Sequence, residues 1–265
     1  MGRFRLHHHI ERQQQRRRGN VVDRAGTASL QDAQIRHAED FLSFNHFFPR
    51  ALTAGARPID PAPDALVSPV DGTVSEAGSI PEGRLIQAKG IDYSAAELLG
   101  LDTVGLGGFL GGEFVTLYLS PRDYHRIHMP MDGRLRAMHY QPGRLFSVNP
   151  TTVKGLPGVF NRNERLVLLF DTAVGPVALV MVGAFFVGSI QTRWTGLVTP
   201  PHRHQPWQRS LPTPIAVPKG AEIGRFNMGS TVILLSGAGA LRWLKHIEPG
   251  QSVRMGEPIG RLGGH

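Results

Sequence analysis

The sequence of 265 residues contains no cysteine. Disulfide bridges, thiolate metal sites and cysteine nucleophiles are therefore excluded together, while the cellular compartment stays open. Acidic residues are also scarce, since 21 Asp and Glu stand against 29 Lys and Arg and leave a formal net charge of +8. A basic balance of this kind indicates an anionic partner such as nucleic acid, anionic lipid or an acidic substrate.

Long uninterrupted apolar segments are lacking as well. No apolar segment follows the first arginines, so we expect no signal peptide. Residues 173–190 carry no charge and reach the lower limit of a membrane span, but Gly175, Pro176 and Gly183 interrupt them. We therefore predict no span here but two buried strands around a turn at 171–176.

The 32 glycines and 20 prolines favour short strands joined by turns. We predict a mostly β fold of the α+β class with short peripheral helices. Residues 113–120 alternate as a half-buried strand does, and Ser94 followed by Glu97 predicts a short capped helix. Residues 199–214 hold five prolines and are predicted to form a surface loop.

The first 40 residues form a basic leader that precedes a domain predicted to span residues 41–265. Six arginines stand within its first 18 residues, where Glu11 is the one acidic residue. Such a segment is either a solvated tail or a contact with a phosphate-bearing surface, for which we expect an anionic membrane and not nucleic acid.

A weak repeat is visible in the turns. The segment 68–74, Ser-Pro-Val-Asp-Gly-Thr-Val, is similar to 129–135, Met-Pro-Met-Asp-Gly-Arg-Leu, and each is predicted to open a strand through an Asp-Gly turn with positive φ. Gly220 and Gly250 begin a second pair of similar segments. Duplicated units of this kind resemble the biotinyl/lipoyl hybrid β-folds and predict a duplicated β-sandwich core; the alternative is that such turns recur in any β-rich protein.

Four side chains supply the groups of an activated hydroxyl, namely Asp71, His125, His128 and Ser230. Each also has a simpler interpretation. Asp71 could shape its turn, the two histidines could be half of a metal site that lacks a third ligand, and Ser230 could lead into a buried strand at 232–235.

The segments around these residues resemble the bacterial type of phosphatidylserine decarboxylase. The resemblance covers roughly residues 40–260 in family order. It rests on the runs Ser68–Gly72, Ser120–Pro130, Pro142–Asn149, Asn161–Arg165, Phe170–Thr172, Val182–Ala184, Val187–Ile190, Thr199–Pro201 and Met228–Thr231. Met228 replaces the leucine usual in the family, a nearly isosteric change that we expect cleavage to survive. The leader lacks the apolar amphipathic helices common in members, which leaves the mode of membrane attachment open.

The resemblance implies that the chain cuts itself between Gly229 and Ser230 into a β chain, 1–229, and an α chain, 230–265. Ser230 would become a pyruvoyl cofactor, and no metal is expected. His128 would act as the base for cleavage, with Asp71 orienting its imidazole. His125 would serve decarboxylation as proton donor or as partner of the substrate carboxylate.

The resemblance further implies a phosphatidylserine substrate and a catalytic domain at 41–265. We expect the two cut chains to form a heterodimer, or a dimer of heterodimers, bound peripherally at the cytoplasmic face of the bacterial membrane. Three other functions remain open: a pyruvoyl decarboxylase of soluble amino acids, a hybrid-fold binding module, and a serine hydrolase. The hydrolase is disfavoured because no Gly-x-Ser-x-Gly motif surrounds Ser230.

Overall fold

A computed structural model describes residues 30–35, 37, 40–41, 47–184, 189–227 and 230–263. Most of the predicted leader lies outside the described residues, as do Met228 and Gly229 at the predicted cleavage site. Among the helices of the described part, none has the length and apolar character needed to cross a membrane.

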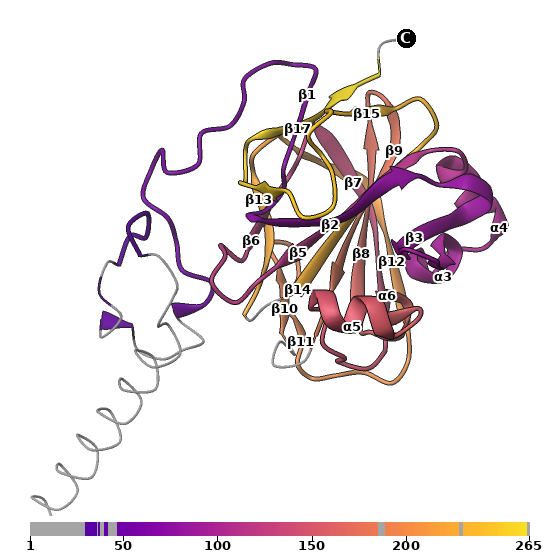
Figure 1. The fold of residues 1–265 in the computed structure, drawn as a ribbon, viewed down its shortest axis with the longest axis horizontal. Coiled ribbons are helices and arrows are strands. Elements are labelled where there is room, and N and C mark those ends of the chain that lie inside the picture. Colours follow the sequence, from indigo (N-terminus) through magenta and orange to yellow (C-terminus); the bar gives the residue numbers. More distant parts are fainter. Residues whose placement is uncertain are drawn as a thin grey trace, which may run out of the picture.

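Strands dominate the chain from residue 65 onward (Figure 1). They are β1 (Ala65–Val67), β2 (Gly72–Ser79), β3 (Arg84–Ala88), β4 (Ile91–Ser94), β5 (Glu113–Leu119), β6 (Arg126–His128), β7 (Gly133–Gln141), β8 (Arg165–Thr172), β9 (Gly175–Val182), β10 (Ile190–Thr192), β11 (Gly196–Thr199), β12 (Trp207–Val217), β13 (Glu222–Phe226), β14 (Ser230–Ser236), β15 (Leu241–Trp243), β16 (Ser252–Val253) and β17 (Pro258–Leu262).

The helices of the described part are short. They are α3 (Ala95–Leu99), α4 (Thr103–Leu106), α5 (Pro150–Gly155) and α6 (Val159–Arg162), with 3-10 turns at Pro81–Gly83 and Gly107–Phe109. The hydroxyl of Ser94 accepts a hydrogen bond from the Glu97 amide, so the predicted cap on α3 is confirmed. The predicted class, mostly β with short helices, is also confirmed.

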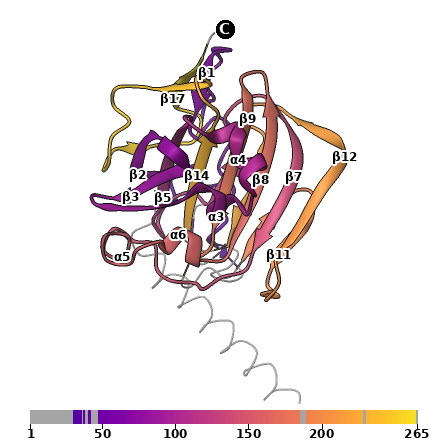
Figure 2. The ribbon, with the colours of Figure 1, turned by 90° about the vertical axis from the view of Figure 1, so that its right-hand side faces the viewer.

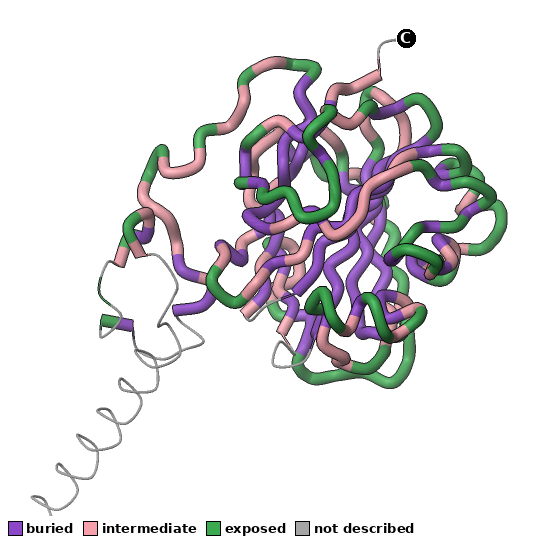
Figure 3. The backbone as a smooth tube through the Cα atoms, in the orientation of Figure 1, coloured by how far each residue is buried: buried purple, intermediate pink, exposed green. Residues whose placement is uncertain are grey.

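The largest sheet has the strand order β12-β7-β8-β9-β14-β5-β2-β16 (Figures 1 and 2). A four-stranded sheet, β11-β10-β13-β6, contacts one of its faces, where Gly224 of β13 lies against Met181 of β9. On the other face, Arg165 of β8 donates to the carbonyls of Glu97 and Leu98 in α3. The central strands are therefore covered on both sides, and they are the buried middle of the molecule in Figure 3.

Burial on both faces of the sheet explains why the central strands carry continuous apolar runs. All seven residues of β14 are buried between β5 and β9, as the apolar run at 232–235 predicts. The prediction of a half-buried strand at 113–120 is wrong in its burial, because β5 lies inside the sheet and five of its seven residues are buried. The predicted pair of buried strands is confirmed by β8 and β9, which join around Ala173 and Val174.

The loop predicted for 199–214 is wrong in its second half. Residues from Trp207 onward belong to β12, which lies at the edge of the large sheet and pairs only with β7. An edge strand tolerates proline because one row of its amides has no partner strand. The pairing with β7 shifts register between Ser210 and Ile215, the stretch that contains Pro212 and Pro214.

The turn repeat is present in the hydrogen bonds of the structure. Asp71 Oδ1 accepts from the Met255 amide at 2.9 Å, and Asp132 Oδ1 accepts from the Lys219 amide at 2.7 Å. Strands β2 and β7 begin directly after these aspartates, and they pair with β16 and β12 at the two ends of the large sheet. The two Asp-Gly turns therefore occupy equivalent positions in two similar halves.

The second pair of similar turns is not the predicted one. The Gly220 amide donates to the Met129 carbonyl at 2.8 Å, and the Gly256 amide donates to the Ser68 carbonyl at 3.0 Å. Both glycines have positive φ, 80° and 90°. Gly256, and not Gly250, is therefore the counterpart of Gly220.

The glycines of the two Asp-Gly turns leave space for neighbouring atoms that lie close to their Cα, and they do not adopt positive φ. Neither Gly72 nor Gly133 is among the residues with positive φ. A Cβ on Gly72 would lie 2.6 Å from the Tyr118 carbonyl oxygen, and one on Gly133 would lie 2.7 Å from Met129 Cε. The predicted conformation of these turns is therefore wrong, although each does open a strand.

Candidate active site

His128, the last residue of β6, contacts the first Asp-Gly turn and also the turn at Gly220, which is bonded to Met129 at the start of the second repeat. The His128 amide donates to the carbonyl of Pro69 in the first turn at 2.9 Å, and His128 Nδ1 donates to the carbonyl of Gly220 at 2.8 Å. Because Nδ1 carries the proton, Nε2 presents its lone pair and accepts from the Tyr124 hydroxyl at 3.0 Å. Burial lowers the pKa of His128, so the ring is neutral at physiological pH.

Asp71 is held in a network that does not include the His128 ring. Its carboxylate accepts from Arg57 Nε at 2.9 Å and Arg57 Nη2 at 2.6 Å, besides the Met255 amide. Arg57 also donates to Asp32 at 2.9 Å. The side chains of Arg57 and Asp71 are only 11% and 12% exposed, which makes this a largely buried ion pair.

The predicted orientation of the His128 imidazole by Asp71 is therefore not a direct hydrogen bond in the structure. Both ring nitrogens are occupied, by Tyr124 and by the Gly220 carbonyl, and the carbonyl is the group that orients the ring. Asp71 acts on His128 through its charge, which opposes the lowering of the histidine pKa by burial. Its hydrogen bond to Met255 also supports the simpler interpretation that Asp71 shapes its turn.

His125 lies directly before β6 and is fully buried. Its Nδ1 donates to the Asp123 carbonyl at 2.8 Å, and its ring contacts the Phe48 ring at an angle of 47°, with centroids 4.0 Å apart. Nε2 is buried, and no described residue forms a hydrogen bond with it. Burial lowers the pKa of His125 to about 3, so the ring is neutral and offers an unused lone pair.

Ser230 begins the central strand β14, where it pairs with Leu119 of β5. The residue is fully buried, and its Oγ has no hydrogen-bond partner among the described residues. A buried hydroxyl without a partner is costly, and in a native protein it calls for an explanation. The predicted cleavage partner Gly229 lies outside the described residues, so the geometry of the bond itself is not described.

A cavity of about 470 Å³ opens beside Asp71 and Tyr124. It is bordered by Arg50, Arg122 and Arg254 as well as by Arg57, so cations outnumber the three aspartates on its wall. The described residues contain no cluster of three or more His, Asp or Glu side chains suited to a metal ion. The pair His125 and His128 thus has no third ligand in this part of the chain.

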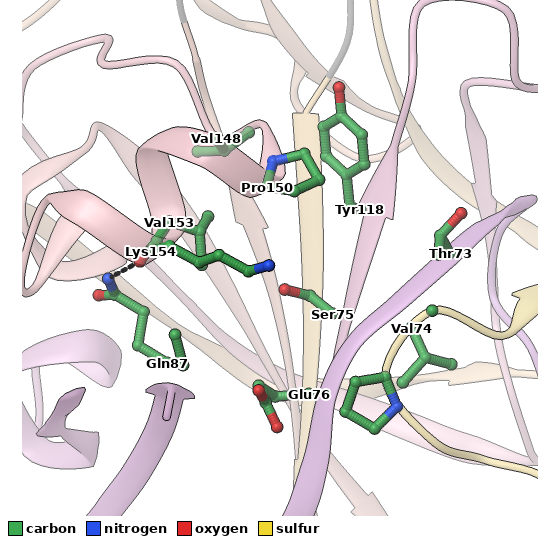
Figure 4. A pocket seen from close by; sticks show the side chains of 13 residues that line it. Thr73, Val74, Ser75, Glu76, Gln87, Tyr118, Val148, Pro150, Val153 and Lys154 are labelled. Atoms are coloured by element: carbon green, nitrogen blue, oxygen red, sulfur yellow. Dashed lines mark hydrogen bonds between the residues drawn. The ribbon is translucent and has the colours of Figure 1, made fainter. Parts of the chain in front are cut away.

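A second cavity of about 280 Å³ lies between β2 and α5 (Figure 4). Its wall includes the apolar side chains of Val74 in β2, Val153 in α5 and Val148, which lies just before α5. In Figure 4 the side chain of Lys154 reaches from α5 toward Ser75 of β2. The two cavities share residues of their walls, namely Thr73, Tyr118 and Pro150, and are therefore adjacent.

Several residues of this region were not singled out by the sequence. Arg57 and Arg50 are isolated arginines whose partners lie far along the chain, so no local pattern marks them. Tyr124 stands in the run 120–130 that carries the resemblance, but only the fold shows its contact with His128.

Glu164 is a buried carboxylate whose place near the site was also not predicted from the sequence. It accepts from the Tyr140 hydroxyl and pairs with His202 Nδ1 at 2.9 Å. Its Oε2 lies 4.0 Å from the position that a Cβ on Gly183 would take. Gly183 directly follows Val182, the residue of β9 that pairs with Thr231 of β14. The carboxylate therefore lies near the strand end that carries Ser230.

Comparison with known proteins identifies the family to which the chain is similar. Residues 44–261 match the family of phosphatidylserine decarboxylases. The chain is 52% identical over 236 residues to the phosphatidylserine decarboxylase proenzyme of Nitrosococcus oceani, which covers 88% of this chain and 77% of that protein. It is 53% identical over 232 residues to the proenzyme of Azotobacter vinelandii, covering 86% of this chain and 81% of that protein. The chain therefore belongs to the phosphatidylserine decarboxylase family.

Proposed function

We propose that this chain, a carboxy-lyase made as a proenzyme, converts phosphatidylserine to phosphatidylethanolamine and CO₂ with a pyruvoyl group formed by self-cleavage at Gly229–Ser230. The observation that carries the proposal is Ser230 Oγ, which is buried without a partner at the first residue of a central strand. A nucleophile in this position is held rigidly by the sheet, and no competing hydrogen bond occupies its lone pairs.

In the cleavage step Ser230 Oγ attacks the carbonyl carbon of Gly229, and the peptide bond becomes an ester as the chain nitrogen leaves. Glycine suits this position because it has no Cβ to block the attack. The serine proton goes to a base, for which we propose His128. The pKa of His125, about 3, makes that ring a weak proton acceptor, whereas a base works best with a pKa near the working pH.

His128 can take the proton only if Nε2 leaves the Tyr124 hydroxyl. The negative charge of Asp71 then stabilises the imidazolium that forms. Elimination across the Cα–Cβ bond of Ser230 releases the carboxylate of Gly229. Hydrolysis of the resulting dehydroalanine leaves the pyruvoyl group on residue 230 and releases ammonia.

The site fits a pyruvoyl group because residue 230 is buried and its side-chain oxygen has no protein partner to lose. The group supplies a ketone that condenses with the substrate amine and takes up the electrons released as CO₂ leaves. We assign His125 to this half of the reaction. Its neutral ring supports a role as hydrogen-bond acceptor and gives no support to a cationic contact with the substrate carboxylate.

We further propose that the α and β chains remain together as a heterodimer and that this unit binds an anionic membrane from the cytoplasmic side. The net charge of +8 supports an anionic surface as partner. The basic leader, which carries six arginines within its first 18 residues, is the segment we expect to contribute most of this attraction.

Intact-mass measurement tests the proposal. The wild-type chain is expected to yield two fragments, with the pyruvoyl mass at the start of 230–265, and to decarboxylate phosphatidylserine in vesicles but not soluble phosphoserine. Ser230→Ala is expected to leave one chain of 265 residues without activity. An uncut wild-type chain, or a cut Ser230→Ala chain, would overturn the assignment.

Two histidine variants test the division of roles. His128→Ala is expected to slow cleavage by about 10²- to 10⁴-fold, the usual contribution of a positioned base. His125→Ala is expected to cut normally and to turn over poorly. Complete cleavage of His128→Ala would exclude His128 as the base, and normal turnover of His125→Ala would exclude His125 from decarboxylation.

A further inference from the structure

Arg50 is a buried cation with unused donors. The residue is 5% exposed, and Nε and Nη1 are both buried without a hydrogen-bond partner in the part of the chain that the structure describes. Nη2 donates to the Arg122 carbonyl at 2.9 Å, and the guanidinium carbon lies 5.2 Å from the centre of the Phe47 ring. Arginine stays charged in proteins, so its burial calls for an anionic partner.

The carboxylates near Arg50 do not fill this need. Asp71 and Asp123 are the two whose charges act on it. The carboxylate of Asp71 is engaged by Arg57 and the Met255 amide, and Asp123 Oδ2 accepts from the amide and the hydroxyl of Ser120. Within the described part of the chain, the acceptor that Nε and Nη1 lack is therefore absent.

Arg50 borders the cavity of about 470 Å³ together with Arg122 and Arg254. Both of these residues are exposed, and no hydrogen bond of either guanidinium occurs among the described residues. Arginines are well suited to phosphate because their planar donors match two of its oxygens at once. We propose that Arg50, with Arg122 and Arg254 at the rim, binds the phosphodiester of the lipid substrate.

This inference rests on the proposed function, and the position of the cavity supports it. Tyr124, whose hydroxyl donates to His128, lines the cavity. Tyr118 and Ser120 on its wall precede and follow Leu119, so the cavity lies at the end of β5 that pairs with Ser230. In the substrate the phosphodiester lies only a few bonds from the amine that reacts, so both must bind close together. The adjacent cavity with Val74, Val148 and Val153 on its wall offers apolar surface to the part of a lipid that follows the phosphate.

The phosphodiester of the substrate is a better partner for Arg50 than the substrate carboxylate, which is lost as CO₂. A buried cation on that carboxylate would stabilise the ground state and oppose the departure of CO₂. A cation on the phosphodiester favours substrate and transition state equally and therefore acts on binding alone. The expected signature is a change in KM without a matching change in kcat.

The test compares Arg50→Met and the rim double variant Arg122→Gln/Arg254→Gln with wild type in mixed micelles of a neutral detergent. Each is expected to mature into two fragments, and KM for phosphatidylserine is expected to rise roughly 10- to 100-fold for Arg50→Met, as for a lost hydrogen bond to a charged group. Arg209→Gln is the matched control, because this exposed arginine lies on β12 at the opposite edge of the sheet.

Inorganic phosphate provides a second readout that needs no turnover. It is expected to raise the melting temperature of uncut Ser230→Ala protein and to inhibit wild type competitively, and both effects are expected to vanish with Arg50→Met. If Arg50→Met fails to fold, the rim double variant decides by the same measurements.

An unchanged KM in the variants that fold would overturn the inference, even if phosphate still binds, since the site would then serve free phosphate. A loss of cleavage with unchanged KM would also overturn it, because Arg50 would then serve maturation. Failure of wild type to cut or to decarboxylate would instead refute the proposed function.

Discussion

Asp71 and Asp132 occupy equivalent turns and yet differ in their surroundings. Both accept a hydrogen bond from the backbone amide two residues after the end of the strand that pairs beside them. Only Asp71 is buried and also binds Arg57, whereas Asp132 is exposed. The motif Pro-x-Asp-Gly predicts the shared function of shaping a turn. It could not predict the ion pair, because Arg57 is brought to Asp71 by the path of the chain before β1.

Asp71→Asn is therefore expected to be far more damaging than Asp132→Asn. In the uncut Ser230→Ala background, the loss of a largely buried charge partner should lower the free energy of unfolding by about 3 kcal/mol. The exposed Asp132 should cost less than about 1 kcal/mol. Urea unfolding measures both, and the cleavage rate of each variant with Ser230 intact measures the catalytic part. Equal losses for the two variants would mean that Asp71 acts only in its turn.

At the level of elements, sequence patterns identified strands by their apolar content but not by their neighbours. The apolar runs of β8, β9 and β14 and the cap of α3 were predictable because their signals are local. The burial of β5 and the pairing of β12 were not, since each depends on which strand or sheet covers it. The need for glycine at Gly72 is of the same kind, because it arises from the approach of β2 to β5.

Gly72→Ala is expected to separate β2 from β5 beside Asp71. The new Cβ would meet the Tyr118 carbonyl at 2.6 Å, and overpacking against backbone costs about 1–3 kcal/mol. The loss is expected in melting temperature and in the rate of cleavage. Gly155→Ala is the control, because no atom lies within 4 Å of its added Cβ, and alanine near a helix end is neutral or stabilising. Normal cleavage in Gly72→Ala would show that this approach does not position the site.

For the whole molecule, the segment 230–265 is built into two of the sheets, the eight-stranded one and a three-stranded one. Strand β14 pairs with β5 and β9, β16 pairs with β2, and β17 pairs with β1. Cleavage before Ser230 would therefore cut the chain without separating the two parts, because the buried strand β14 would have to leave the core first.

The cut protein is accordingly expected to elute from a sizing column as one species and to release the fragment 230–265 only in denaturant. Mass spectrometry of the native complex and of the denatured sample measures this directly. Elution of the small fragment alone under native conditions would contradict the placement of β14 in the middle of the large sheet.

The central position of β14 also determines whether the protein can refold before and after cleavage. The uncut chain folds by an intramolecular search, in which β14 finds β5 and β9 while tethered to β13 by three residues. After cleavage the same pairing would be a meeting of two separate chains, and its success would depend on concentration. Thermal unfolding would then be reversible for the precursor and irreversible for the mature enzyme, whose persistence is governed by how slowly it unfolds.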